Sequence, residues 1–150
     1  MLRIARPLAL RIGAASLAVV ALTGGGLVLA APADAAACDT WGATGTPGDI
    51  AGAYAHGSLC DDPVTGRLDL EALLKDTSPD GMSACVQIHA TYADGGTRDE
   101  WVYNSGGSGS TKVADYTFAS SVRNIWVREG LGKGGVCTSM AGGVHSIYTY

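Results

Sequence analysis

The chain has 150 residues, of which 14 are acidic, 10 are basic and 22 are glycine. This length fits one domain, and a hydrophobic share of 47% with 16% charged residues argues against a disordered chain. The high glycine content argues against a helical bundle, because glycine is unfavourable inside helices. No block of basic residues occurs, so the composition also argues against a dedicated nucleic-acid-binding protein.

The first 35 residues have the pattern of a secretory signal peptide. Three arginines precede an uncharged run over residues 12–31, and Ala33 with Ala35 satisfies the small-residue rule for cleavage after Ala35. Ala37 offers a second cleavage position. The run is long enough to span a bilayer, but its three glycines and the lack of a following positive cluster disfavour a membrane anchor. We therefore expect a secreted, extracellular protein.

The predicted mature chain is a single disulfide-bonded, β-rich domain over residues 36–150. It loses three arginines and Asp34, and it keeps seven basic and 13 acidic residues, a net charge of −6. Acylation of Cys38 is the other way to hold such a chain at a membrane. Pro32 and Asp34 break the apolar pattern that a lipoprotein signal requires, so we expect no stable membrane anchor.

All four cysteines lie in the predicted mature chain, and an even number in a small exported domain predicts two disulfides. No two cysteines are closer than 22 residues, so no zinc half-site is present and we expect no metal or cofactor. Three connectivities are possible. Sequential pairing closes the shortest loops and favours the bridges Cys38–Cys60 and Cys85–Cys137.

The first half of the mature chain has weak secondary-structure signals. Residues 39–62 are rich in glycine and predict short extended pieces held by the first disulfide. Residues 68–75 read Leu-Asp-Leu-Glu-Ala-Leu-Leu-Lys and predict one helix of about two turns, with Asp69 as its N-cap. Pro79 and the Asp80-Gly81 pair end this predicted helix.

From Ser83 onward the hydrophobic period changes to two, which is typical of strands. Asp94-Gly95-Gly96 predicts a hairpin turn between the first two strands. Glycine-rich loops separate the later ones. The pattern therefore predicts a small antiparallel β-sandwich or barrel with one short helix and two disulfides. The strands are expected at residues 83–92, 98–104, 113–118, 122–129, 136–139 and 144–150.

Alternation within the strands predicts which side chains face outward. Cys85 lies on the face opposite Val86 and Ile88, so the bridge to Cys137 is expected on the outer face, where it would clip a neighbouring strand or loop.

Trp126 lies opposite Ile125 and Val127 in the same way. An outward tryptophan on a sheet suits a sugar or a partner protein, whereas packing against other side chains is the alternative.

A glutamate, an arginine and a histidine follow one another along the predicted strands, and together they could act as base, phosphate-binding residue and acid. Glu100, then Arg123 or Arg128, then His145 resemble the base, phosphate-binding and acid residues of small secreted guanyl-type ribonucleases. The resemblance implies that Glu100 removes a proton from the 2′-hydroxyl, His145 protonates the leaving oxygen, and an arginine holds the phosphoryl charge. Only under this alternative function would nucleic acid be a ligand.

The Ala- and Gly-rich leader, residues 121–128 and the trailing Cys137 resemble small secreted actinobacterial β-rich proteins of unknown function. The resemblance implies an extracellular location and brings no catalytic residue. No nucleophile elbow, phosphate loop or metal motif occurs in the chain. The leading hypothesis is therefore a non-catalytic binding module for an extracellular protein or glycan, and the ribonuclease is the alternative.

Overall fold

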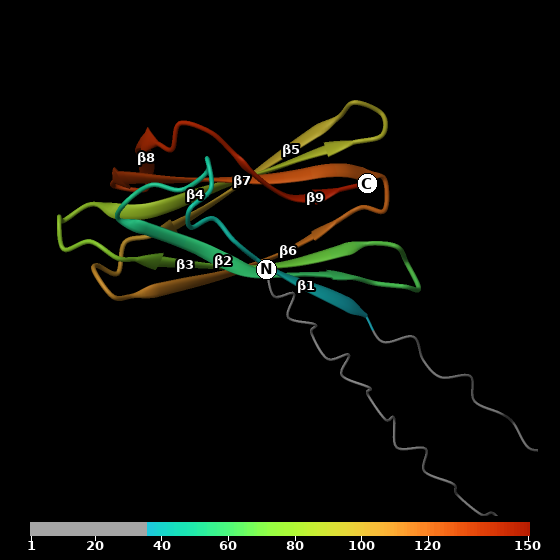
Figure 1. Ribbon diagram of the computed structural model, residues 1–150, viewed down its shortest axis with the longest axis horizontal. Helices are drawn as coiled ribbons and strands as arrows, with labels where there is room; N and C mark the ends of the chain where they lie inside the picture. Colours follow the sequence, from blue (N-terminus) through green and yellow to red (C-terminus); the bar gives the residue numbers. More distant parts are fainter. Residues whose placement is uncertain (1–35) are drawn as a thin grey trace, which may run out of the picture. The chain divides into compact units, whose positions relative to one another are not determined.

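The computed structural model describes residues 36–150, which form two stacked antiparallel β-sheets (Figure 1). The predicted signal peptide and its cleavage position after Ala35 lie outside the described residues. Ala37, the second predicted cleavage position, is the first residue of a strand. Among residues 36–150, no segment forms a helix of the length and hydropathy needed to cross a membrane.

The first sheet has four strands in the order β1-β2-β3-β6. The second sheet has the order β5-β4-β7-β8, and β9 also pairs with β7. The chain enters the second sheet at β4, returns to the first at β6 and crosses again at β7 (Figure 1). The strands are β1 (Ala37–Gly42), β2 (Ala53–Asp61), β3 (Leu68–Asp76), β4 (Ser83–Tyr92), β5 (Thr97–Asn104), β6 (Thr111–Phe118), β7 (Val122–Lys133), β8 (Val136–Met140) and β9 (His145–Thr149).

One hydrophobic core lies between the two sheets and takes side chains from both. The clearest alternation is in β3 and over residues 125–129 of β7, where every second residue is buried, since successive side chains of a strand point to opposite faces. The prediction of a mainly β, antiparallel fold is confirmed, and of the two predicted forms, sandwich or barrel, the structure has two separate sheets. The largest buried apolar side chains are Phe118, Leu70, Leu74, Ile88, Ile125, Val86, Val122 and Val127.

The helix predicted over residues 68–75 is wrong, because this segment is strand β3. Leu68, Leu70, Ala72 and Leu74 are buried, and the residues between them face outward. As a strand between β2 and β6, the segment forms backbone hydrogen bonds on both sides. An isolated helix of two turns is marginal in water, so pairing and burial outweigh the helix propensity of leucine and lysine.

The later strands agree with their predicted positions to within a few residues. Asp94-Gly95-Gly96 makes the turn of the β4-β5 hairpin, and Gly95 has a positive φ of 83°. In the glycine-rich region over residues 39–62, the extended pieces are two paired strands, β1 and β2, with a long loop between them.

Both predicted disulfides are present. Cys38 and Cys60 are directly paired residues of β1 and β2, so this bridge staples an edge strand to the first sheet. Cys85 of β4 is joined to Cys137 of β8, although β7 lies between these strands. A Cβ on Gly130 of β7 would lie 3.0 Å from the Cys85 Sγ, so the bridge runs close over a residue without a side chain. The bridge lies on the face opposite Val86, as alternation predicted.

Three segments follow the outward edge of β7 in turn. Strand β9 pairs with β7 from Asn124 to Val127, and β8 pairs with it from Gly130 to Lys133. Between them, the N–H of Glu129 donates to the carbonyl oxygen of Gly48 at 2.9 Å. Gly48 belongs to the loop between β1 and β2, so this loop fills the gap between β9 and β8.

Candidate functional site

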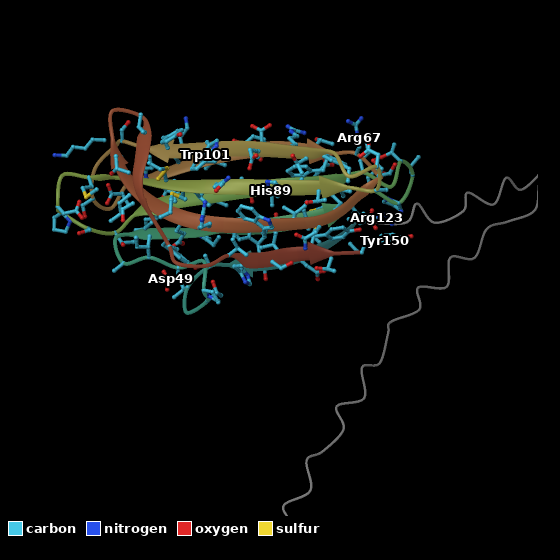
Figure 2. The ribbon with its side chains drawn as sticks, turned by 90° about the horizontal axis from the view of Figure 1, so that it is seen from above. Asp49, Arg67, His89, Trp101, Arg123 and Tyr150 are labelled. Atoms are coloured by element: carbon cyan, nitrogen blue, oxygen red, sulfur yellow. A yellow bond between two sulfur atoms is a disulfide. The ribbon has the colours of Figure 1, made fainter. Side chains whose placement is uncertain are left out.

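The outer face of the second sheet carries an aromatic and polar surface, which Figure 2 shows from above with His89 and Trp101 labelled. The strand register aligns its side chains in rows across three strands. None of the nine residues is Leu, Ile, Val or Met. We call this surface the aromatic face; it comprises Gln87, His89 and Thr91 of β4, Asp99, Trp101 and Tyr103 of β5, and Asn124, Trp126 and Arg128 of β7.

A chain of hydrogen bonds crosses the aromatic face. Arg128 Nη2 donates to Gln87 Oε1 at 2.8 Å, and Gln87 Nε2 donates to Asp99 Oδ1 at 2.9 Å. The same oxygen lies 2.9 Å from His89 Nδ1. The hydrogen bond with His89 is the largest cause that holds the pKa of Asp99 below its usual value, and the bond from Gln87 adds to it. The network therefore fixes four planar side chains relative to one another.

The aromatic rings of this face are stacked in pairs. The ring of His89 lies 4.6 Å from that of Trp126 with an interplanar angle of 17°, and the Arg128 guanidinium lies 5.9 Å from the Trp126 ring. Trp101 stacks on Tyr103 at 6.2 Å and is 37% exposed. Trp126 faces outward as predicted. Its side chain is nevertheless half-buried, and His89 covers one side of its ring. Trp101 is thus the more accessible tryptophan.

The aromatic face also brings a hydroxyl, an imidazole and a carboxylate into line. Thr91 Oγ1 lies 3.4 Å from His89 Nε2, and Asp99 binds the other ring nitrogen. Nucleophilic catalysis also needs donors aimed at the oxyanion. Strand β4 is paired with β5 on one side and β7 on the other. The backbone N–H groups around Thr91 are therefore engaged in hydrogen bonds of the sheet and do not point at an oxyanion. This arrangement suits hydrogen bonding to a ligand better than acyl transfer.

The residues of the ribonuclease alternative lie in different places. Glu100 pairs with Ile88, Ile88 with Val127, and Val127 with His145, so this row crosses four strands. Three inter-strand steps separate the Cα atoms of Glu100 and His145 by about 14 Å. Ile88 and Val127 are buried between them. Glu100 accepts a hydrogen bond from Arg98 Nε at 2.7 Å, which raises the pKa of Arg98.

The two candidate arginines are engaged at different positions. Arg123 lies 4.2 Å over the ring of Tyr150, and Figure 2 shows these two side chains together at one end of the sheet. Arg128 belongs to the network of the aromatic face. Its Nε is buried without a hydrogen-bond partner among residues 36–150. The structure thus places Arg128 and Trp126 at one surface and brings neither Glu100 nor His145 to it.

Acidic residues of the loops hold turns. Asp62 accepts hydrogen bonds from the N–H groups of Val64 and Thr65, and the Thr65 hydroxyl also donates to it. These bonds lower the pKa of Asp62. Asp76 and Asp80 each accept from the N–H two residues onward. In the part of the chain that the structure describes, no three His, Cys, Asp or Glu side chains form a group that could hold a metal ion.

A buried acid lies on the core side of β7. Glu129 has no exposed surface, and its carboxyl accepts hydrogen bonds from the N–H of Ala55 at 2.5 Å and of Ile50 at 3.1 Å. Burial raises the pKa of Glu129 to about 7, since desolvation and the nearby Asp49 outweigh the two backbone bonds. The acid ties β7 to β2 and to the β1-β2 loop, which is a structural role.

Reasoning from the sequence placed Trp126 on the outward side of its strand and missed most of its neighbours. Alternation in residues 83–92 and 98–104, with the hairpin turn between them, contains a signal for the pairing of His89 with Asp99. The position of Arg128 next to Gln87 depends on pairing between β4 and β7, which are distant in the sequence.

The chain matches no protein-family model, no curated protein sequence and no solved structure. The resemblance to small secreted actinobacterial proteins therefore stays a prediction.

Proposed function

We propose that residues 36–150 are a secreted, non-catalytic binding module that binds an extracellular glycan through the aromatic face. The observation that carries the proposal is the hydrogen-bonded row from Arg128 through Gln87 to Asp99, next to the exposed ring of Trp101. These groups are already held in place, so binding would cost little additional side-chain entropy.

Sugars present two kinds of surface, and the aromatic face offers a partner for each. Their C–H groups pack on aromatic rings, which here are Trp101 and Tyr103. Their hydroxyl groups both donate and accept, so they suit a surface that combines a carboxylate, an amide and a guanidinium. The fixed geometry of these planar groups supports recognition of one arrangement of hydroxyls.

The composition of the aromatic face favours a glycan over a protein partner. Its apolar groups are all aromatic, with no aliphatic side chain among the nine residues. Two disulfides in a chain of this size are consistent with an oxidising, extracellular environment.

The test is binding of the oxidised mature chain to an array of oligosaccharides, followed by titration of the best ligand. We expect Trp101→Ala to weaken binding at least about tenfold, because it removes the exposed ring. Tyr150→Ala is the matched control, since Tyr150 is an exposed aromatic residue outside the aromatic face. Equal losses in the two variants would contradict the assignment of the site.

Two other outcomes would replace the proposal. Specific binding of a purified protein at the aromatic face, with no glycan bound, would favour the protein-binding alternative. RNA cleavage by the wild type that is lost in both Glu100→Gln and His145→Ala would establish the ribonuclease alternative, despite the row of buried residues between these side chains.

A further inference from the structure

The charges of the aromatic face are balanced within the face. Its permanent charges are one guanidinium, on Arg128, and one carboxylate, on Asp99, and Gln87 links the two through hydrogen bonds. The carboxylate also binds His89. A ligand therefore meets a surface with little net charge, in which both charged groups already have partners.

The other arginines of these strands are occupied as well. Arg98 of β5 donates to Glu100 and to the backbone oxygen of Thr117. Arg123 of β7 lies over the ring of Tyr150. Neither is part of the aromatic face.

The rest of the domain is acidic. Residues 36–150 carry 13 acidic and seven basic residues. On the outer face of the first sheet, a shallow hollow is lined by Asp69, Glu71 and Asp115. The overall field would therefore disfavour the approach of an anionic ligand to either sheet.

The unused atoms of the network suit hydroxyl groups. Both hydrogen bonds to Asp99 go to Oδ1, so Oδ2 can accept from a ligand. At the other end, Arg128 has donors beyond the Nη2 bond to Gln87. Asp99 offers an acceptor at one end of the network and Arg128 offers a donor at the other. Neighbouring sugar hydroxyls fit this pair, because they are neutral and can both donate and accept hydrogen bonds.

We infer that the glycan bound at the aromatic face is uncharged, built of neutral sugars without carboxylate, sulfate or phosphate groups. This inference rests on the proposed function and adds the chemical class of the ligand. Charge balance at the site and the negative charge of the surrounding domain are the two observations that support it.

The test compares a neutral oligosaccharide with its uronic-acid counterpart at about 20 mM and about 500 mM NaCl, because salt screens interactions between exposed charges. We expect the neutral ligand to bind with less than about a twofold change in Kd, and the acidic one to bind at least about tenfold more weakly at low salt. Tighter, salt-sensitive binding of the acidic ligand would overturn the inference and leave glycan binding intact. Failure of both ligands, with the array also negative, would instead defeat the proposed function.

A charge variant makes the test sharper. Asp99→Asn leaves the Arg128 charge unbalanced, so we expect it to gain affinity for the acidic ligand at low salt and to lose that gain at high salt. Asp69→Asn removes the same charge from the opposite sheet and serves as the control. An equal gain in both variants, or none in Asp99→Asn, would overturn the inference that charge balance within the aromatic face selects the ligand.

Discussion

Replacing Glu129 by glutamine tests the energetic role of the buried acid. The ordinary pKa of this carboxyl is 4.5, and burial raises it to about 7 in the folded chain. Below pH 4.5 the acid is protonated in both the folded and the unfolded state, and its contribution to stability is complete. Between pH 4.5 and 7 the unfolded chain ionises first, so the free energy of unfolding falls as the pH rises.

The size of this fall follows from the difference between the two pKa values. A rise of the pKa from 4.5 to about 7 corresponds to roughly 3 kcal/mol, most of which is lost between pH 5 and pH 8. In Glu129→Gln the side chain stays neutral. One acceptor for Ala55 is kept, and the bond to Ile50 is lost at a cost of about 1 kcal/mol.

The wild type and Glu129→Gln should therefore be nearly equal in stability at pH 5, and the variant should be about 2 kcal/mol more stable at pH 8. Urea unfolding followed by tryptophan fluorescence, with the disulfides intact, measures this difference. Glu71→Gln is the control, because Glu71 is an exposed residue of β3 and its variant should follow the wild-type curve. Parallel curves for the wild type and Glu129→Gln from pH 5 to pH 8 would refute the reasoning.

Three further outcomes are expected. Gly132→Ala should lower the free energy of unfolding by about 3 kcal/mol or more, measured by urea unfolding, because its Cβ would lie 1.8 Å from a backbone oxygen of β8. Cys85→Ser should cost more stability than Cys38→Ser, by less than about 1 kcal/mol on loop length alone, since the bridges close loops of 52 and 22 residues. Loss of the imidazole in His89→Ala should raise the pKa of Asp99 towards its usual value, which a carboxyl NMR titration measures.

The β3 segment shows why periodicity alone was ambiguous. Leu70, Leu73 and Leu74 have the spacing of a helical stripe, while Leu68, Leu70 and Leu74 also fit a two-residue alternation. The second pattern applies because β2 and β6 lie on either side of this segment. β2 lies in a glycine-rich region without a clear strand signal, so the sequence offered little evidence for a partner there.

The aromatic face was predictable in part. The Asp94-Gly95-Gly96 turn fixes the register of a local hairpin, and this register brings Asp99 to His89. Pairing of β4 with β7 joins segments separated by two other strands, so Arg128 could not be placed from the sequence.

Glu129 illustrates the same limit. Glu129 lies two residues after Val127, so alternation directs both side chains inward. The backbone N–H groups that donate hydrogen bonds to its buried carboxyl lie 74 and 79 residues away. Long-range partners of this kind depend on the tertiary fold, which local propensity does not specify.

The succession of β9, Gly48 and β8 along β7 also affects how copies of the protein could associate through their sheet edges. An open sheet edge offers unpaired N–H and C=O groups to another chain and is a route to aggregation. Here the longest strand has its outward edge occupied along almost its whole length, and the gap between the two short strands is closed by Gly48, where a Cβ would lie 2.8 Å from the backbone nitrogen of His145. Among residues 36–150, the strands that keep an open edge are therefore β1, β5 and β6, together with the short β8 and β9 of five residues each.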